Sequence, residues 1–347
     1  MRFAERAVGE GARPLIVAEL SGNHNGSLER ALAIVDAAAD AGADAVKLQT
    51  YTADTMTLDA GGRDFTIDDP SSPWHGRRLY DLYGEAATPW EWHPALFERA
   101  RERGIACFSS PFDESAIAYL ERFDPPAYKI ASFELTDLPL IAAAARTGRP
   151  LVVSTGMATL DEIGAAVTTA REHGAPDVVL LKCTSTYPAS PQNSHLRTIP
   201  DLRARFGCEV GLSDHTGGIG AAIAAVALGA AMIEKHVTLA RADGGVDAAF
   251  SLEPRELAAL VLESARAWEA LGEVRYGPTR AERGSLRFRR SLYVADDVRA
   301  GDELTPRNVR IVRPGFGLPP SAYAEVLGRR AARDLARGTA LAWEHIA

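Results

Sequence analysis

Eight short apolar runs of strand length alternate along the chain with segments of helical periodicity. The runs cover residues 15–20, 45–49, 105–109, 127–130, 151–154, 178–182, 209–213 and 232–236. Between them, apolar residues recur every three or four positions, as at 160–173 and 219–228, and Ser27 is placed to cap a helix that follows it. Eight strands alternating with helices over roughly 250 residues predict an α/β fold of the (β/α)8 TIM-barrel type.

An open, doubly wound sheet could also use eight strands, and two observations favour the barrel. No glycine-rich dinucleotide fingerprint follows the first apolar run. Polar residues also end nearly every run, and in a barrel all of these positions converge on one face. We therefore expect the functional site at the carboxyl ends of the strands.

The pattern changes after the last helical segment, which extends from about residue 254 to 271. Residues 276–290 are basic and polar, and residues 291–347 alternate short β-like runs with turns. We predict a catalytic barrel at 1–275, a linker at 276–290 and a small second domain at 291–347. The segment 50–92 is too long for a simple loop and predicts a substrate-side insertion, although its tryptophans could equally be packing anchors.

Composition and charge restrict the function further. The chain has 347 residues, 46% of them hydrophobic, and a net charge of −8, which argues against nucleic acid as the main partner. No apolar run is long enough to span a membrane, and the charged N-terminus does not resemble a signal peptide. Three widely spaced cysteines, Cys107, Cys183 and Cys208, have no metal-like or redox-like pairing and predict reduced thiols. We therefore expect a cytoplasmic protein without a membrane partner.

Lysines and histidines at the predicted strand ends suggest two kinds of ligand. Lys47, Lys129 and Lys182, together with nearby hydroxyls, would suit an anion. His215 and His236 end consecutive strands, whose spacing of about 5 Å would bring both imidazoles to one ion. Such an open site suits Mn²⁺ or a related divalent ion. The alternative is a pair of hydrogen-bonded histidines in a polar core, and the pattern alone does not decide between them.

Many short motifs, in order along the chain, resemble the sialic acid synthase family. They are AELSGNHN (18–25), GADAVKLQT (42–50), SPFD (110–113), KIASFE (129–134), STGM (154–157), GLSDHT (211–216) and IEKH (233–236). RSLY (290–293) and RPG (313–315) resemble the antifreeze-protein-like (SAF) domain that follows the barrel in this family. Within the family, PWEWH (89–93), CFSSPFDES (107–115) and KCTS (182–185) resemble the pseudaminic acid branch more than the N-acetylneuraminate branch.

The resemblance implies an enzyme, a transferase that forms a carbon–carbon bond between phosphoenolpyruvate and the open-chain aldehyde of an N-acylated amino sugar. The products would be a nine-carbon 2-keto sugar acid and phosphate. For the pseudaminic acid branch the sugar is 2,4-diacetamido-2,4,6-trideoxy-L-altrose. The alternatives are the same reaction giving N-acetylneuraminate or legionaminate, and, from another class, a non-catalytic sugar-binding protein.

The resemblance also implies roles for individual residues. The divalent ion, Mn²⁺ with Mg²⁺ or Co²⁺ as alternatives, would be held by His215 and His236 and would polarise the aldehyde oxygen. A carboxylate must then help water to quench the oxocarbenium-like centre, with Glu19 and Glu234 as unranked candidates. The residues implied to hold phosphoenolpyruvate are Lys47, Lys129, Ser154, Thr184 and Ser213. Those implied to contact the sugar are Gln49, Glu134, Tyr187 and Asp247, with Arg313 reaching the acyl group from the tail of the other protomer in a domain-swapped homodimer.

Two positions depart from the family pattern. Val246 stands where a proline is usual, which could loosen the loop that presents Asp247. Thr184 stands where some members carry serine, and this change preserves the hydroxyl.

Overall fold

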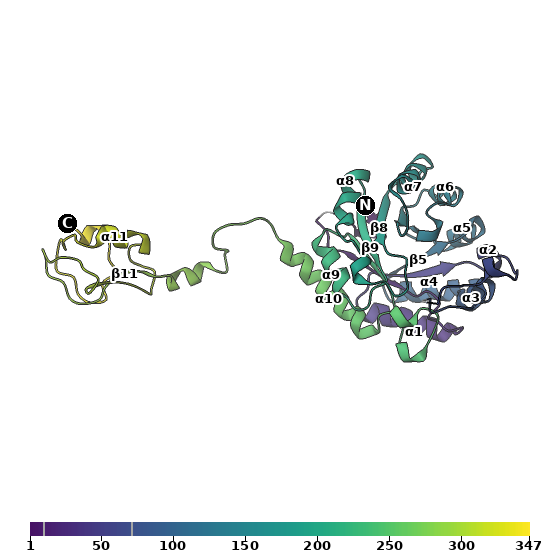
Figure 1. The fold of residues 1–347 in the computed structure, drawn as a ribbon, viewed down its shortest axis with the longest axis horizontal. Helices are drawn as coiled ribbons and strands as arrows, with labels where there is room; N and C mark the ends of the chain where they lie inside the picture. Colours follow the sequence, from purple (N-terminus) through teal and green to yellow (C-terminus); the bar gives the residue numbers. More distant parts are fainter. Residues whose placement is uncertain (10, 71) are drawn as a thin grey trace. The chain divides into compact units, whose positions relative to one another are not determined.

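The chain folds into two compact units in the computed structural model, which describes residues 1–9, 11–70 and 72–347. The first unit, residues 1–272, contains a closed barrel of parallel strands in chain order (Figure 1). Its strands are β3 (Leu15–Glu19), β4 (Ala45–Thr50), β5 (Ala106–Pro111), β6 (Tyr128–Ile130), β7 (Leu151–Ser154), β8 (Val178–Cys183), β9 (Glu209–Asp214) and β10 (Met232–His236). Because β10 pairs with β3, placing His236 opposite Glu19, the barrel is closed and the predicted TIM-barrel class is confirmed.

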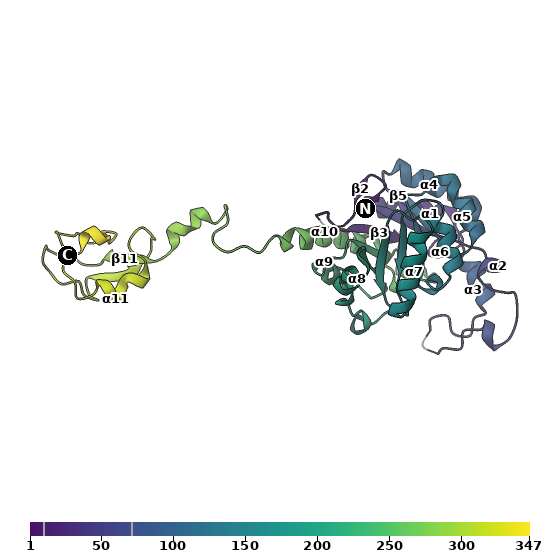
Figure 2. The same ribbon diagram turned by 90° about the horizontal axis from the view of Figure 1, so that it is seen from above.

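Helices surround the barrel, as Figures 1 and 2 show from two directions. They are α1 (Leu28–Asp40), α4 (His93–Glu102), α5 (Glu114–Leu120), α6 (Leu138–Ala145), α7 (Leu160–Glu172), α8 (Thr198–Phe206), α9 (Gly220–Ala227) and α10 (Pro254–Leu271). The predicted cap of α1 is confirmed, since the Ser27 hydroxyl accepts a hydrogen bond from the Arg30 amide. In the described part of the chain, no helix combines the length and the apolar character needed to cross a bilayer.

The barrel interior changes from apolar to charged within two residues along β3, β4 and β6. Its lower layer is a buried cluster that includes Val17, Ala45 and Ala127. Since alternate residues of a strand face the same side, the inward residues two positions further on are Glu19, Lys47 and Lys129. The apolar layer is thus a floor on which a ring of charged side chains stands.

A short N-terminal hairpin, absent from the sequence prediction, packs against this floor. Strands β1 (Arg2–Phe3) and β2 (Arg6–Ala7) pair antiparallel, and Phe3 is buried in the same cluster as the floor residues. The ring of Phe3 meets that of Phe108 edge to face, with 5.0 Å between centroids. The hairpin contributes apolar surface to the floor and is too short for a periodicity signal.

The segment between β4 and α4 forms an insertion that contains two further helices, α2 (Ala53–Met56) and α3 (Leu79–Ala86). These helices lie side by side in both ribbon views.

The second unit, residues 273–347, has its own small core. Strands β11 (Ser291–Val294) and β12 (Val309–Val312) pair antiparallel, and a short helix, α11 (Tyr323–Val326), follows. Leu292, Val294, Leu304 and Leu341 are among its fully buried residues. The core is small, as expected for so short a domain.

Candidate active site

A cavity of about 350 Å³ opens at the carboxyl ends of the barrel strands. Such a volume lies in the range of small-molecule sites. Of the residues proposed from the sequence, those that line it are Lys47, Gln49, Lys129, Glu134, Ser154, Tyr187, Ser213, His215, Glu234, His236 and Asp247. The structure therefore brings together residues from five barrel strands and from the segments that follow four of the strands.

Two buried lysines give one side of the cavity a positive charge. Lys129 Nζ donates to Ser154 Oγ at 2.7 Å, and Lys47 Nζ donates to Ser110 Oγ at 3.3 Å. Burial lowers the pKa of Lys129, whereas for Lys47 the neighbouring Glu19 and Glu234 outweigh burial and raise it. Ammonium and hydroxyl groups at this spacing are suited to the oxygens of a carboxylate or phosphate.

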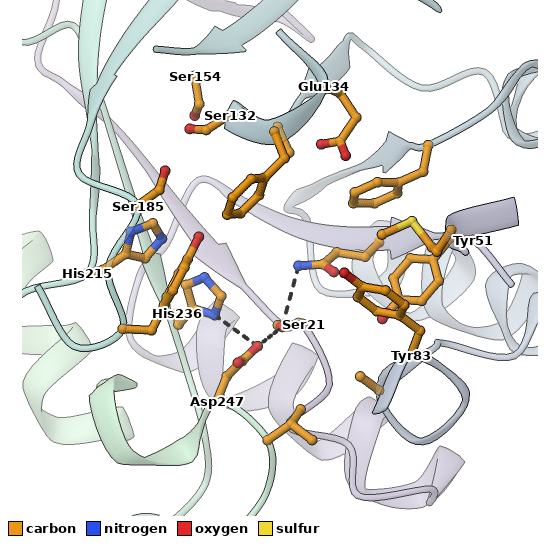
Figure 3. A pocket seen from close by; sticks show the side chains of 18 of the residues that line it. Ser21, Tyr51, Tyr83, Ser132, Glu134, Ser154, Ser185, His215, His236 and Asp247 are labelled. Carbon is orange, nitrogen blue, oxygen red and sulfur yellow. Dashed lines mark hydrogen bonds and ion pairs between the residues drawn. The ribbon is translucent and has the colours of Figure 1, made fainter. Parts of the chain in front are cut away.

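Two further serines join this anion-binding side. Figure 3 shows Ser132, Ser154 and Ser185 converging on the same part of the cavity. Ser132 Oγ accepts a hydrogen bond from the amide of Gly156 at 3.1 Å. A side-chain carbon at Gly156 would overlap with the hydroxyls of Ser132 and Ser185, so glycine leaves both hydroxyls in place.

The two candidate carboxylates lie on neighbouring strands but in different surroundings. Glu19 is fully buried, pairs with Lys47, and accepts hydrogen bonds from the Ser21 amide and from Gln49 Nε2. Glu234 lines the cavity, and its Oε1 accepts from Ser213 Oγ at 3.0 Å. Burial raises the pKa of Glu19 against the attraction of Lys47, whereas Lys129 and Lys47 outweigh burial and lower the pKa of Glu234. Glu234 is thus the ionised carboxylate that faces the cavity.

The two histidines face each other with ring centroids 5.2 Å apart. His236 Nδ1 is buried without a hydrogen-bond partner, 3.6 Å from Asp247 Oδ2. Burial and the positive charge of His215 lower the pKa of His236 well below its usual value, so its ring is neutral. An unpartnered, buried, neutral ring nitrogen is a donor of the kind that a divalent ion requires.

The donor set fits an open metal site rather than a closed cage. No group of three or more His, Cys, Asp or Glu side chains suited to a metal ion occurs among the residues that the structure describes. His215 directs Nδ1 to the Thr184 carbonyl at 3.0 Å, which leaves Nε2 for another ligand. Two histidines with the remaining positions open to water and substrate could form such a site, and the ligand assignment stays a prediction.

Cys183 also faces the cavity, close to His215. Its Sγ lies 3.9 Å from His215 Nδ1. Burial alone would raise the pKa of the Cys183 thiol, but the contact with His215 lowers it to about 7. For His215, burial lowers the pKa of the ring, but the contact with Cys183 raises it by more, so the net shift of the His215 pKa is upward. All three cysteines of the chain are free thiols.

The polar residues on the other side of the cavity form a connected set. Gln49 Nε2 donates to Ser21 Oγ at 3.4 Å, and Ser21 Oγ donates to Asp247, whose carboxylate faces His236 (Figure 3). The Ser251 hydroxyl donates to the Asp247 carbonyl at 2.7 Å. Asp247 is therefore fixed from two sides, although its loop carries Val246 in place of the usual proline.

Four of the residues singled out in the sequence do not line the cavity. Glu19 lies behind Lys47, and Thr184 directs its hydroxyl to the Asn193 carbonyl at 3.0 Å. Lys182 faces away from the barrel interior because Cys183, its neighbour on β8, faces inward, and its Nζ donates to the Cys183 carbonyl. Arg313 belongs to the second unit, where it is exposed directly after β12.

Several cavity residues were not proposed from the sequence, among them Ser21, Ser185, Tyr51, Tyr83 and Trp74. Ser21 and Ser185 lie in the loops directly after β3 and β8, so their place behind the carboxyl ends of barrel strands could have identified both. Tyr51, Trp74 and Tyr83 belong to the insertion, which therefore lines the cavity, and its role as a substrate-side element stays a prediction. Of the tryptophans in the insertion, Trp74 lines the cavity, whereas the other two are packing anchors. Trp90 donates to the Tyr51 carbonyl, and Trp92 packs on His24.

Comparison with protein-family models identifies the barrel. Residues 34–276 match the model of the NeuB family, and residues 289–347 match that of the SAF domain. The chain belongs to the NeuB family. This confirms the resemblance to sialic acid synthases and the SAF class of the C-terminal domain.

Curated relatives cover nearly the whole chain. Pseudaminic acid synthase of Campylobacter jejuni is 46% identical over 94% of this chain and 94% of its own length. Pseudaminic acid synthase of Helicobacter pylori is 42% identical over 96% and 98%. N,N'-diacetyllegionaminic acid synthase of Legionella pneumophila is 35% identical over 95% and 94%. Among solved structures, N-acetylneuraminic acid synthetase of Leptospira borgpetersenii superposes with a TM-score of 0.73 at 31% identity, covering 82% of this chain and 94% of that one.

Proposed function

We propose that this NeuB-family chain is a pseudaminic acid synthase, a transferase that condenses phosphoenolpyruvate with 2,4-diacetamido-2,4,6-trideoxy-L-altrose. The products are a nine-carbon 2-keto sugar acid and phosphate. The observation that carries the proposal is one cavity holding two buried lysines, a ring of hydroxyls, an ionised carboxylate and two facing histidines. The identity of 46% with a pseudaminic acid synthase, against 35% with a legionaminic acid synthase, favours this sugar.

Phosphoenolpyruvate would bind on the anion side of the cavity. Lys47 and Lys129 would neutralise its carboxylate and phosphate, and Ser132, Ser154, Ser185 and Ser213 would donate to their oxygens. Because these groups are already in place and largely dry, they cost little reorganisation during the reaction. Thr184 would help through its carbonyl, which orients His215.

The sugar aldehyde would lie toward the histidines, and His215 and His236 would hold a divalent ion, Mn²⁺ with Mg²⁺ or Co²⁺ as alternatives. Such an ion supplies Lewis-acid polarisation of the aldehyde oxygen when bound. Gln49, Glu134, Tyr187 and Asp247 would fix the sugar chain so that its aldehyde carbon faces the methylene carbon of phosphoenolpyruvate. When these two carbons bond, the aldehyde oxygen takes up a proton, and the carbon that carries the phosphate becomes a cationic centre.

Water must add to that cationic centre before phosphate can leave. Glu234 is the ionised carboxylate that lines the cavity, so we assign it the roles of electrostatic partner and base for this water. Glu19 is a positioning residue, since it holds Lys47 and Gln49 from behind. Water adds to the cationic carbon and gives one proton to Glu234, and the resulting hydroxyl gives its proton to the departing phosphate, which leaves the keto group.

The proposal includes a homodimer in which the SAF domain of one protomer completes the site of the other. Arg313 has no ion-pair partner within the described residues of its own chain and is exposed, so it is free to contact the acyl group of a substrate in the partner. The free thiols are consistent with a cytoplasmic location.

Phosphate release from phosphoenolpyruvate tests the proposed function. Purified protein should release phosphate with the 2,4-diacetamido trideoxy sugar, and metal removal by a chelator should abolish release until Mn²⁺ is restored. Calorimetry of Mn²⁺ binding to wild-type protein and to His236→Ala checks the ligand assignment without relying on turnover. Phosphate release with N-acetylmannosamine alone would contradict the assigned sugar. No phosphate release with any sugar would contradict the hypothesis that the protein is an enzyme.

A further inference from the structure

The insertion supplies a continuous apolar wall to the cavity. We call insertion wall the set of residues Tyr51, Met56, Ile67, Leu79, Leu82 and Tyr83, all of which line the cavity. Only the two tyrosines carry a polar side-chain atom. The ring of Tyr51 packs edge to face on Tyr83, at 6.0 Å between centroids, and on Phe112, at 5.1 Å, which extends the apolar surface.

The insertion wall lies across the cavity from the reactive groups. In Figure 3, Tyr51 and Tyr83 face the cavity from the side opposite to His215 and His236. A sugar whose aldehyde carbon is held at the histidines would therefore direct the far end of its chain, several bonds away, toward this wall. The polar residues Ser21, Gln49 and Asp247 are joined by hydrogen bonds in the same cavity, with Asp247 beside His236, and suit the polar groups of a sugar.

The wall is also held over the cavity by a specific contact. Trp74, from the same insertion, donates its indole N–H to the Val246 carbonyl at 3.0 Å, and its ring lies 5.7 Å from that of Tyr187. This contact ties the insertion to the loop that carries Asp247. The polar atom of Trp74 is thereby satisfied, so this side chain adds further apolar surface to the cavity.

We propose that the insertion wall selects sugars whose terminal carbon is a methyl group rather than a hydroxymethyl group. This inference rests on the proposed function and adds the feature that recognises the 6-deoxy end of the substrate. A terminal hydroxyl placed against Met56, Ile67 and Leu79 would lose its water without gaining a hydrogen bond. An apolar pocket typically disfavours an added hydroxyl by about 10- to 100-fold.

Two sugars that differ only at carbon 6 test the proposal. They are 2,4-diacetamido-2,4,6-trideoxy-L-altrose and its 6-hydroxy counterpart, each assayed for kcat/KM with saturating phosphoenolpyruvate and Mn²⁺. The wild-type protein should prefer the deoxy sugar by about 10- to 100-fold. The near-isosteric variants Met56→Gln and Leu79→Asn should each reduce that preference by about 10-fold, because they offer the hydroxyl a partner.

The variants have a matched control in the same insertion. Leu58 is 67% exposed and does not line the cavity, so Leu58→Gln should leave the preference at its wild-type value. Met56 and Leu79 are only partly buried, and α2 contains no fully buried residue, so both variants are expected to fold. A wild-type preference near one, or an unchanged preference in Met56→Gln and Leu79→Asn, would overturn the inference.

A binding measurement separates this inference from the proposed reaction. The sugar alcohols made by reducing the two aldehydes cannot react, and calorimetry should give a lower Kd for the 6-deoxy alcohol. Turnover of both sugars at equal rates would contradict the role of the insertion wall but would agree with the synthase reaction. Selective binding of the 6-deoxy alcohol without any turnover would support the role of the wall but contradict the synthase reaction. The absence of both turnover and selective binding would contradict both proposals.

Discussion

The ammonium group of Lys47 forms a buried ion pair with Glu19, with Nζ 2.6 Å from Oε2. The same nitrogen lies 3.8 Å from Glu234 Oε1, so one lysine stands between both candidate carboxylates. Only Glu234 lines the cavity. The sequence could not rank the two residues, because both lie near the carboxyl ends of strands that become neighbours only when the barrel closes, and the closed barrel decides which of them faces the cavity.

This arrangement predicts different kinetic defects for the two glutamates. Glu234→Gln should lower kcat by about 10²- to 10⁴-fold, because it removes the proposed base and its negative charge. Glu19→Gln should mainly raise the KM for phosphoenolpyruvate, because it releases Lys47. Steady-state kinetics with phosphoenolpyruvate varied would check both. A large fall in kcat for Glu19→Gln with an unchanged KM, beside a nearly normal Glu234→Gln, would reverse the assignment.

Glu134 predicts a pH dependence in sugar binding. Its Oε2 is buried without a hydrogen-bond partner, and burial raises the pKa of this carboxyl to about 7. The group is therefore neutral below pH 7 and ionised above it, and the ionised form is the stronger acceptor for a sugar N–H or O–H. We expect kcat/KM for the sugar to rise between pH 6 and pH 8 with a midpoint about 7.

Glu134→Gln supplies the control for this pH dependence. The amide keeps the size of the side chain but cannot ionise, so the rise between pH 6 and pH 8 should disappear. Assays at saturating phosphoenolpyruvate keep the titration of that substrate out of the measurement. The same rise in the variant would show that another group titrates.

A second buried ion pair lies in the barrel wall outside the cavity. Lys235 Nζ lies 2.8 Å from Asp214 Oδ2 and donates to the Thr216 carbonyl at 2.7 Å. Lys235→Met would leave the Asp214 carboxylate buried without its counter-charge, so we expect the free energy of unfolding to fall by about 3–5 kcal/mol. Urea denaturation followed by circular dichroism would measure this loss.

Lys182→Met is the matched control for this loss of stability. Lys182 also faces away from the cavity, but its Nζ donates to the Cys183 carbonyl and to Thr184 Oγ1 rather than pairing with a carboxylate. Its replacement should cost about 1 kcal/mol. Equal losses in the two variants would refute a special role for the Asp214–Lys235 pair.

The sequence predicted the barrel because its strands are continuous apolar runs separated by clear helical periodicity. It could also place the lysines at strand ends, but it grouped Lys182 with Lys47 and Lys129 although the three do not face the same way. Strand periodicity separates them. The residues two positions after the floor residues Ala45 and Ala127 are the inward lysines Lys47 and Lys129, whereas the residue two positions after Leu181 is Cys183, so Lys182 faces outward. The insertion wall could not be predicted in this way, because short helices and turns carry no periodic signal that specifies which side chains face a cavity.

The position of Arg313 gives the last prediction, which concerns the proposed exchange of SAF domains. Arg313→Ala should raise the KM for the sugar, and His236→Ala should abolish turnover. If Arg313 acts on the cavity of the partner, a hybrid dimer of the two variants has one intact site. That site combines the barrel of the Arg313→Ala chain, which keeps His236, with the SAF domain of the His236→Ala chain, which keeps Arg313.

Mixing the two variants after dissociation therefore measures which chain supplies Arg313. Random reassociation makes half of the dimers hybrids, and one of the two sites in each hybrid is intact, so about a quarter of the wild-type activity at low sugar concentration should appear. If Arg313 served its own barrel, every hybrid site would lack one of the two residues. The mixture would then show only the average of the parent activities, and the proposed exchange would fail.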